Sequence, residues 1–162
     1  MTKATNIISL RPSQAEDEAF LFNLYASTRA DEMALVDWTP QQIEAFLHMQ
    51  FNAQRNYYHE QYHTAEYHII QCNGVDIGRL IVDRDTDMIL LMDISLLPEH
   101  RNSGVGTALI RDLMIEAARA CKPIRLHVEM FNRALHLYER LGFIKIQDAG
   151  IYYEMEWRLG LL

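Results

Sequence analysis

Apolar and polar residues follow two different periods along this chain of 162 residues. Short apolar runs bounded by turn residues predict strands, whereas apolar positions three to four residues apart predict amphipathic helices. The pattern gives strand, two helices, three strands, helix, strand, helix and a closing hairpin. The expected strands are 6–10, 67–71, 75–83, 88–96, 124–129, 143–147 and 151–157, and the expected helices are 14–29, 40–59, 107–120 and 132–141.

Local signals fix several of these boundaries. Ser13 with Glu16, and Thr39 with Gln42, have the capping-box spacing of helix starts. Asn73-Gly74 between two apolar runs is a strong hairpin signal. The helix at 107–120 is expected to lay one apolar face on the sheet. That face comprises Gly106, Ile110, Leu113, Met114 and Ala117.

Composition limits the classes of protein to consider. With 49% hydrophobic residues the chain can bury one sizeable core, so a single domain over 1–162 is expected. The sequence has neither an apolar run of bilayer length nor a charged, apolar leader, which favours a soluble, cytoplasmic protein and no membrane partner. The net charge of −7 argues against nucleic-acid binding, which needs a basic face. Two cysteines make no disulfide framework.

The most informative stretch runs from the apolar strand ending at Leu96 through a glycine turn into a helix. Gly104 and Gly106 lack a Cβ, so the backbone can curve tightly and approach a ligand closely. The first turn of the next helix presents unpaired N–H groups and the positive end of the helix dipole. Such a turn favours an anion, for example a pyrophosphate.

Residue spacing separates three kinds of phosphate loop. A Walker A loop needs Lys and then Ser or Thr after its second glycine, but Thr107 and Ala108 stand here. A dinucleotide fingerprint needs a third glycine where Leu109 stands. The remaining pattern is Arg-x-x-Gly-x-Gly, which Arg101-Asn102-Ser103-Gly104-Val105-Gly106 matches.

Two motifs together carry a resemblance to a family. The first is the Arg-x-x-Gly-x-Gly turn, and the second is the segment 128–143, with a strand end, Asn132, a helix that contains Tyr138, and Gly142-Phe143. In this order the chain resembles the GCN5-related N-acetyltransferases, or GNAT family. The resemblance implies a mixed α/β fold with a central, mostly antiparallel sheet flanked by helices.

The resemblance also implies acetyl-CoA as acyl donor, with its pyrophosphate on the glycine turn. The frequent Gly-Lys pair of the family is replaced here by Asn102-Ser103, which is expected to weaken one phosphate contact without removing the backbone cradle. The cofactor residues implied are Leu96, Leu97, Arg101, Asn102, Ser103, Gly104, Val105, Gly106, Thr107, Asn132 and Tyr138.

Amine attack on a thioester needs positioning, an oxyanion site and management of two protons, but no covalent nucleophile. Tyr138 matches the family tyrosine that protonates the leaving thiolate; burial beside Leu135 is the structural alternative. Asp93, in an otherwise apolar strand, matches an acidic position that serves as base in relatives, or it faces solvent at the edge of the sheet. Glu129 is the alternative base or an anchor for the substrate ammonium.

The acceptor is expected to be a small-molecule or peptide amine. In this fold it is selected mainly by the first two helices and the closing hairpin, where Arg29, Glu32 and Trp38 are candidate binding residues. Packing of Trp38 in the core or at the rim is an equally good explanation. Dimers are frequent in the family, which leaves a homodimer open.

Two other function classes remain. His59-Glu60-Gln61-Tyr62-His63 spells His-Glu-x-x-His, which on a helix holds zinc for a hydrolase. It falls where the second helix is expected to end, and no Gly-x-x-His extension follows to give a third ligand, which leaves only a distant Glu for that role. No metal is predicted. A binding module that keeps the acyl-CoA site without transfer would lack the tyrosine or have a blocked turn, and neither is the case here.

Overall fold

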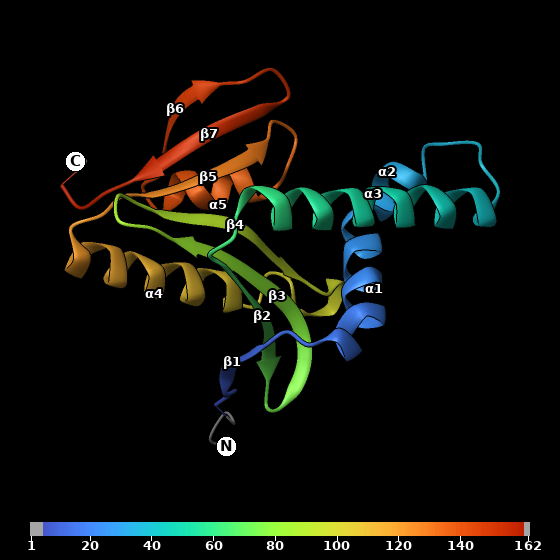
Figure 1. Cartoon of the computed structure of the whole chain (residues 1–162), viewed down its shortest axis with the longest axis horizontal. Helices are drawn as coiled ribbons and strands as arrows, with labels where there is room; N and C mark the ends of the chain where they lie inside the picture. The colour runs from blue at the N-terminus through green and yellow to red at the C-terminus, as the bar shows by residue number, and fades with distance from the viewer. Residues whose placement is uncertain (1–4, 161–162) are drawn as a thin grey trace. The chain divides into compact units, whose positions relative to one another are not determined.

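Seven strands form one mixed sheet flanked by helices in a computed structural model, which describes residues 5–160. The elements are β1 (Ile8–Pro12), η1 (Ala15–Asp17), α1 (Glu18–Thr28), α2 (Ala30–Met33), α3 (Pro40–Gln61), β2 (Ala65–Cys72), β3 (Val75–Arg84), β4 (Ile89–Leu96), η2 (Pro98–His100), α4 (Val105–Ala120), β5 (Ile124–Glu129), α5 (Ala134–Arg140), β6 (Ile144–Asp148) and β7 (Tyr152–Trp157) (Figure 1). The strand order is β1-β2-β3-β4-β5-β7-β6.

This order confirms the expected fold class. β4 and β5 are parallel, whereas the β1–β2, β5–β7 and β6–β7 pairs are antiparallel. The parallel pair needs a long crossover connection, and α4 supplies it.

The described chain divides into two units that interleave along the sequence. The first unit contains residues 5–80 and Ile94–Arg101, and the second contains Ile81–Asp93 and 102–160. β3 and β4 therefore each contribute residues to both units.

In the first unit, the β2–β3 hairpin forms at the predicted turn. Asn73 and Gly74 have φ of 52° and 79°, the positive values that a tight two-residue hairpin requires. Asn73 also fixes the N-terminal strand, because its side-chain oxygen accepts from the Ile7 N–H at 2.9 Å and its own N–H donates to the Ile7 carbonyl at 2.8 Å. β1 consequently pairs with β2 from Ile8 to Pro12, two residues beyond the predicted strand.

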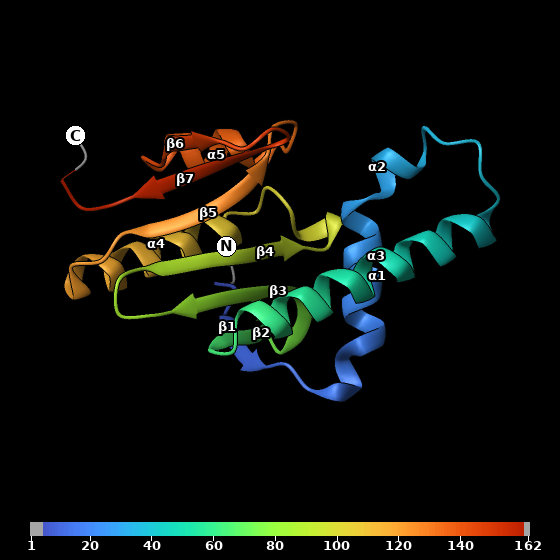
Figure 2. The same ribbon diagram turned by 45° about the horizontal axis from the view of Figure 1, so that its top comes forward.

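The two long helices of the first unit pack on each other. The capping box predicted for α3 is present, since the Gln42 N–H donates to Thr39 Oγ1 at 3.2 Å and the Thr39 N–H donates to Gln42 Oε1 at 2.9 Å. α1 crosses α3 where the two helices are in contact (Figure 2). Tyr25, Leu47 and Phe51 form the buried cluster of this contact.

The helix predicted to begin at Ser13 begins later, which corrects the proposed Ser13/Glu16 capping box. A 3-10 turn, η1, precedes α1, and the carboxylate of Asp17 accepts from the Gln14 N–H at 2.8 Å. The Ser13 N–H instead donates to the carbonyl of Tyr67 at 2.9 Å. α1 ends at Thr28, one residue before the predicted end, and the short helix α2 that follows Arg29 was not predicted.

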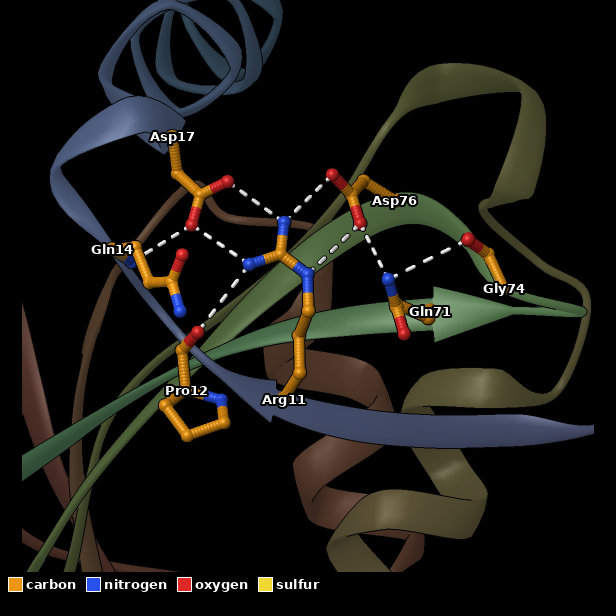
Figure 3. A network of polar contacts seen from close by, with 7 residues as sticks. All are labelled: Arg11, Pro12, Gln14, Asp17, Gln71, Gly74 and Asp76. Atoms are coloured by element: carbon orange, nitrogen blue, oxygen red, sulfur yellow. Dashed lines mark hydrogen bonds and ion pairs between the residues drawn. The ribbon is translucent and has the colours of Figure 1, made fainter.

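A network around Arg11 sets this start (Figure 3). Its guanidinium donates to both oxygens of Asp17, at 2.9 and 2.7 Å, and to Oδ2 of Asp76 at 2.8 Å. Gln71 donates to Oδ1 of Asp76 at 2.9 Å. The side chain of Asp17 is only 10% exposed, so water can do little to stabilise its negative charge. The cation of Arg11 compensates that charge instead.

In the second unit, β5, β7 and β6 lie side by side, and α4 and α5 both contact β5 (Figures 1 and 2). α4 is amphipathic, but its buried face differs from the predicted one. Val105 and Leu109 are buried although they were not predicted to be, and Gly106 and Met114 are only half-buried. No helix within residues 5–160 is long and apolar enough to span a bilayer.

Arg11→Met is expected to lower the free energy of unfolding at pH 7 by about 1–3 kcal/mol, because it leaves the Asp17 carboxylate buried without its cation. Hydrogen bonds from Arg11 hold the pKa of Asp17 and of Asp76 below the usual range. Their stabilisation is therefore present above about pH 4 and is lost as pH falls through the folded-state pKa values. Urea unfolding at pH 7 and pH 3 should show a smaller effect of the substitution at pH 3.

Arg55→Met is the matched control. Arg55 makes an ion pair of 3.1 Å with Glu18, but the two side chains are 40% and 62% exposed, so its loss should cost less than about 1 kcal/mol. An Arg11 variant no less stable than the Arg55 variant would show that the network contributes nothing to stability.

Candidate functional site

The end of β4 is tightly anchored within the first unit. The Leu97 N–H donates to the Ile77 carbonyl at 2.8 Å, and the Leu97 carbonyl accepts from the His100 N–H at 2.9 Å in the turn of η2. The Leu96 carbonyl accepts from Nε of Arg101 at 3.0 Å. Leu96 and Leu97 were expected to offer backbone N–H groups to a ligand, and here the N–H of Leu97 is already bonded to β3.

Gly78 in β3 allows this anchoring. A Cβ at Gly78 would overlap the carbonyl oxygen of Ser95 and lie 2.8 Å from Cδ2 and 3.2 Å from Cα of Leu96. Sequence analysis missed this residue, although a glycine inside an apolar strand is a known sign of close backbone approach.

The glycine turn enters α4 as the sequence predicts. Gly104 is its N-cap with φ of 87°, and Asn102 also has a positive φ of 57°. The first backbone hydrogen bond of the helix runs from the Ala108 N–H to the Gly104 carbonyl at 3.0 Å, so the preceding N–H groups have no acceptor within the helix. A Cβ at Gly104 or Gly106 would meet no atom within 4 Å.

The electrostatics of this turn suit an anion. The first turn of α4 carries no acidic residue, and positions 101–104 are exposed. α4 has 16 residues, which is long enough for a developed dipole at its N-terminus. The turn can therefore bind a phosphate group through backbone N–H groups, with Ser103 and Thr107 as neighbouring hydroxyls.

The second unit brings Tyr138 and Asp93 together. Tyr138 is buried on α5 at 7% exposure, with its ring centroid 5.7 Å from that of Phe143. Burial, reinforced by the negative charge of Asp93, raises the pKa of Tyr138 above the ordinary tyrosine value. Tyr138 therefore stays protonated at neutral pH and also packs in the core.

Glu129 and Asn132 lie where β5 leads into α5. Glu129 is half-buried and pairs with Tyr152 of β7. The Oδ1 of Asn132 accepts from the Ala134 N–H at 2.9 Å, so this side chain stabilises the turn that leads into α5. The helix begins at Ala134, two residues later than predicted. A cofactor contact by Asn132 remains a prediction.

The three expected acceptor residues lie in the first unit. Arg29 makes an ion pair of 3.1 Å with Glu32, and its guanidinium is 5.6 Å from the ring centroid of Tyr25. Trp38 is 43% exposed and makes an edge contact with Phe46 at 5.1 Å. Both the packing role and a binding role of Trp38 are compatible with this arrangement.

The His-Glu-x-x-His segment does not form the zinc geometry. α3 ends at Gln61, so His63 lies beyond the helix that carries His59. The His59 ring stacks on Tyr67 with centroids 5.1 Å apart. Across residues 5–160 there is no group of three or more His, Cys, Asp or Glu side chains suited to a metal ion.

Comparison with protein families identifies the chain. Residues 42–145 match the family described as acetyltransferase (GNAT) domain. The match covers the glycine turn, Asp93 and Tyr138, and the chain therefore belongs to the GNAT acetyltransferase family. No curated protein sequence matches it significantly.

Solved structures of low sequence identity share the fold. The PaiA N-acetyltransferase of Thermoplasma acidophilum, in complex with coenzyme A, is 16% identical with a TM-score of 0.71, over 94% of this chain and 99% of that one. A GNAT acetyltransferase of Elizabethkingia anophelis with acetyl-CoA bound is 17% identical with a TM-score of 0.58, over 94% and 98%. These complexes agree with acetyl-CoA as the cosubstrate of GNAT enzymes.

Gly78→Ala is expected to destabilise the protein by about 1–3 kcal/mol, because β3 and β4 must separate to admit the methyl group. Gly106→Ala is the control: its Cβ meets open space, and alanine favours a helix, so stability should be equal or up to about 1 kcal/mol higher. Thermal and urea unfolding of both variants measure this difference. Equal stabilities would show that the close approach at Gly78 is not required.

Proposed function

We propose that this protein transfers the acetyl group of acetyl-CoA to a primary amine by direct attack in a ternary complex. The observation that carries the proposal is the glycine turn at the start of α4, open above Gly104 and Gly106, in a chain of the GNAT family. Coenzyme A and acetyl-CoA in related folds support the donor. The two units, joined through β3 and β4, would act as a single domain over 1–162.

The backbone of the turn is proposed to bind the pyrophosphate. The N–H groups from Gly104 to Thr107 supply the donors, and Arg101, Asn102 and Ser103 border them. The pantetheine arm would lie beside the end of β4 at Leu96 and Leu97, whose backbone is held in place by the close approach at Gly78 and by the bonds of the Leu97 N–H and the Leu96 carbonyl. Asn132 would contact the same arm.

Acetyl transfer must balance two protons. The amine nitrogen attacks the thioester carbonyl, the C–S bond breaks, the amine loses a proton, and the departing thiolate gains one. Tyr138 is proposed to donate a hydrogen bond and a proton to that sulfur. Burial and the charge of Asp93 raise the pKa of Tyr138, so its hydroxyl is protonated at neutral pH and available as a donor when negative charge develops on the sulfur.

The base is proposed to be Asp93, with Glu129 as the alternative. An amine with a pKa near ~10 is mostly protonated at neutral pH, so a carboxylate must accept its proton directly or through water. Asp93 is within electrostatic range of Tyr138, which supports a role in the same site. A small-molecule or peptide amine would contact Arg29, Glu32 and Trp38.

Gly104→Glu should abolish acetyl-CoA binding measured by calorimetric titration, because it adds a carboxylate at the turn and a side chain where φ is positive. Wild type should bind one acetyl-CoA per chain. Gly150→Glu is a matched control: Gly150 also has a positive φ, of 83°, and no atom within 4 Å of a Cβ, but it lies in the β6–β7 turn.

The same titrations separate the alternatives. Equal loss in both glycine variants would point to backbone strain instead of the cradle. A well-folded wild type that ignores acetyl-CoA and takes up stoichiometric zinc would overturn the proposal in favour of His59 and His63.

Tyr138→Phe should reduce turnover by about 10²-fold or more while acetyl-CoA affinity stays within about twofold, since only the proton donor is removed. Because the pKa of Tyr138 is raised, wild-type turnover should not fall between pH 8 and 9.5 through loss of this proton. Thiol release with the best acceptor from an amine screen measures both effects. Tyr57→Phe, at a side chain 54% exposed, should leave turnover unchanged.

A further inference from the structure

Arg101 connects two elements that are far apart in the sequence of the first unit. Its Nε donates to the Leu96 carbonyl at the end of β4, at 3.0 Å, and its Nη2 donates to Ser27 Oγ on α1, at 3.3 Å. Ser27 Oγ in turn donates to the carbonyl of Leu24 at 2.6 Å. Leu24 is buried at 1% exposure, so this chain of hydrogen bonds ends on a rigid part of α1.

The chemistry of the side chain matters for this connection. A guanidinium is a planar fork that can donate to two acceptors at once, whereas an ammonium is a compact point charge. Both acceptors here, a carbonyl and a hydroxyl, are neutral. Arg101 therefore makes no ion pair in this connection and acts as a fork with several donors.

The Leu96 carbonyl belongs to the same peptide group as the Leu97 N–H. That N–H donates to Ile77, and the adjoining Leu96 Cα would lie 3.2 Å from a Cβ at Gly78. β3 thus holds the peptide group from one direction through its N–H, and Arg101 holds it through its carbonyl. Without Arg101 the carbonyl end of this peptide would lose its link to α1.

We propose that Arg101 is a positioning residue that holds the end of β4 to α1 through Leu96 and Ser27, so that this strand end is preorganised for the pantetheine arm of acetyl-CoA. The cation does not serve as the pyrophosphate ligand. This inference rests on the proposed function, because it relates Arg101 to the binding of the pantetheine half of acetyl-CoA.

Two fragments of acetyl-CoA, used as separate ligands, distinguish a positioning role of Arg101 from a role as phosphate ligand. S-acetylpantetheine lacks the pyrophosphate and the nucleotide, and 3′-phosphoadenosine 5′-diphosphate lacks the pantetheine arm. Calorimetric titration, or competition against acetyl-CoA, gives the affinity of each fragment for the whole protein.

Arg101→Lys, which keeps the charge and loses the fork, should weaken acetyl-CoA and S-acetylpantetheine by a similar factor, about five- to tenfold. Its affinity for the nucleotide fragment should be unchanged. Ser27→Ala should weaken the same two ligands to a smaller degree, and Ser27→Thr, which retains a hydroxyl, should restore the wild-type values. Arg119→Lys, at an exposed position near the end of α4, is the control without effect.

Weaker binding of the nucleotide fragment by Arg101→Lys would overturn the inference and make Arg101 a phosphate ligand. Unchanged binding of acetyl-CoA by Arg101→Lys, or by Ser27→Ala, would overturn it as well. A lower melting temperature with all three affinities retained would show a purely structural role and have the same consequence. Failure of wild type to bind acetyl-CoA would instead reject the proposed function.

Discussion

The close approach of β3 and β4 at Gly78 is the constraint on which the end of β4 depends. Without a Cβ at this position, the Ser95 carbonyl and the Leu96 backbone lie against β3, and the Leu97 N–H reaches the carbonyl of Ile77. The strand then ends at one defined place, and the turn of η2 follows directly. Only seven residues lie between Leu96 and Gly104, so the defined strand end closely precedes the glycine turn in the sequence.

Elements with local signals could be predicted from the sequence, and those that depend on distant partners could not. The Asn73-Gly74 turn and the Thr39/Gln42 capping box need information from only a few neighbouring residues, and both are confirmed. The predicted start of α1 was wrong because Arg11 holds Asp17 in place. Arg11 is itself bonded to Asp76, which lies 65 residues further along the chain. No local pattern contains that contact.

The same distinction applies to the candidate site. The two motifs located the glycine turn and the helix that carries Tyr138, since motif spacing reflects the order of elements in the fold. The electrostatic contact between Asp93 and Tyr138 is visible only in the structure. They did not reveal the bond between Arg101 and Ser27, which spans 74 residues, or the need for glycine at position 78. Nor did they show that Asn132 Oδ1 accepts from the Ala134 N–H, because a motif gives the residue type and not the hydrogen bonds of its atoms.

The interleaving of the two units has a consequence for biosynthesis. As the chain emerges from the ribosome, β1 and β2 can pair once Cys72 is available, at the entropic cost of closing a loop of some 60 residues. The unit to which they belong is still unfinished, since its last segment, Ile94–Arg101, follows Ile81–Asp93 of the other unit. A nascent chain that stops near Leu80 would expose β3 as an open edge able to pair with neighbouring chains. Productive folding of the N-terminal half must therefore wait for translation to pass Arg101.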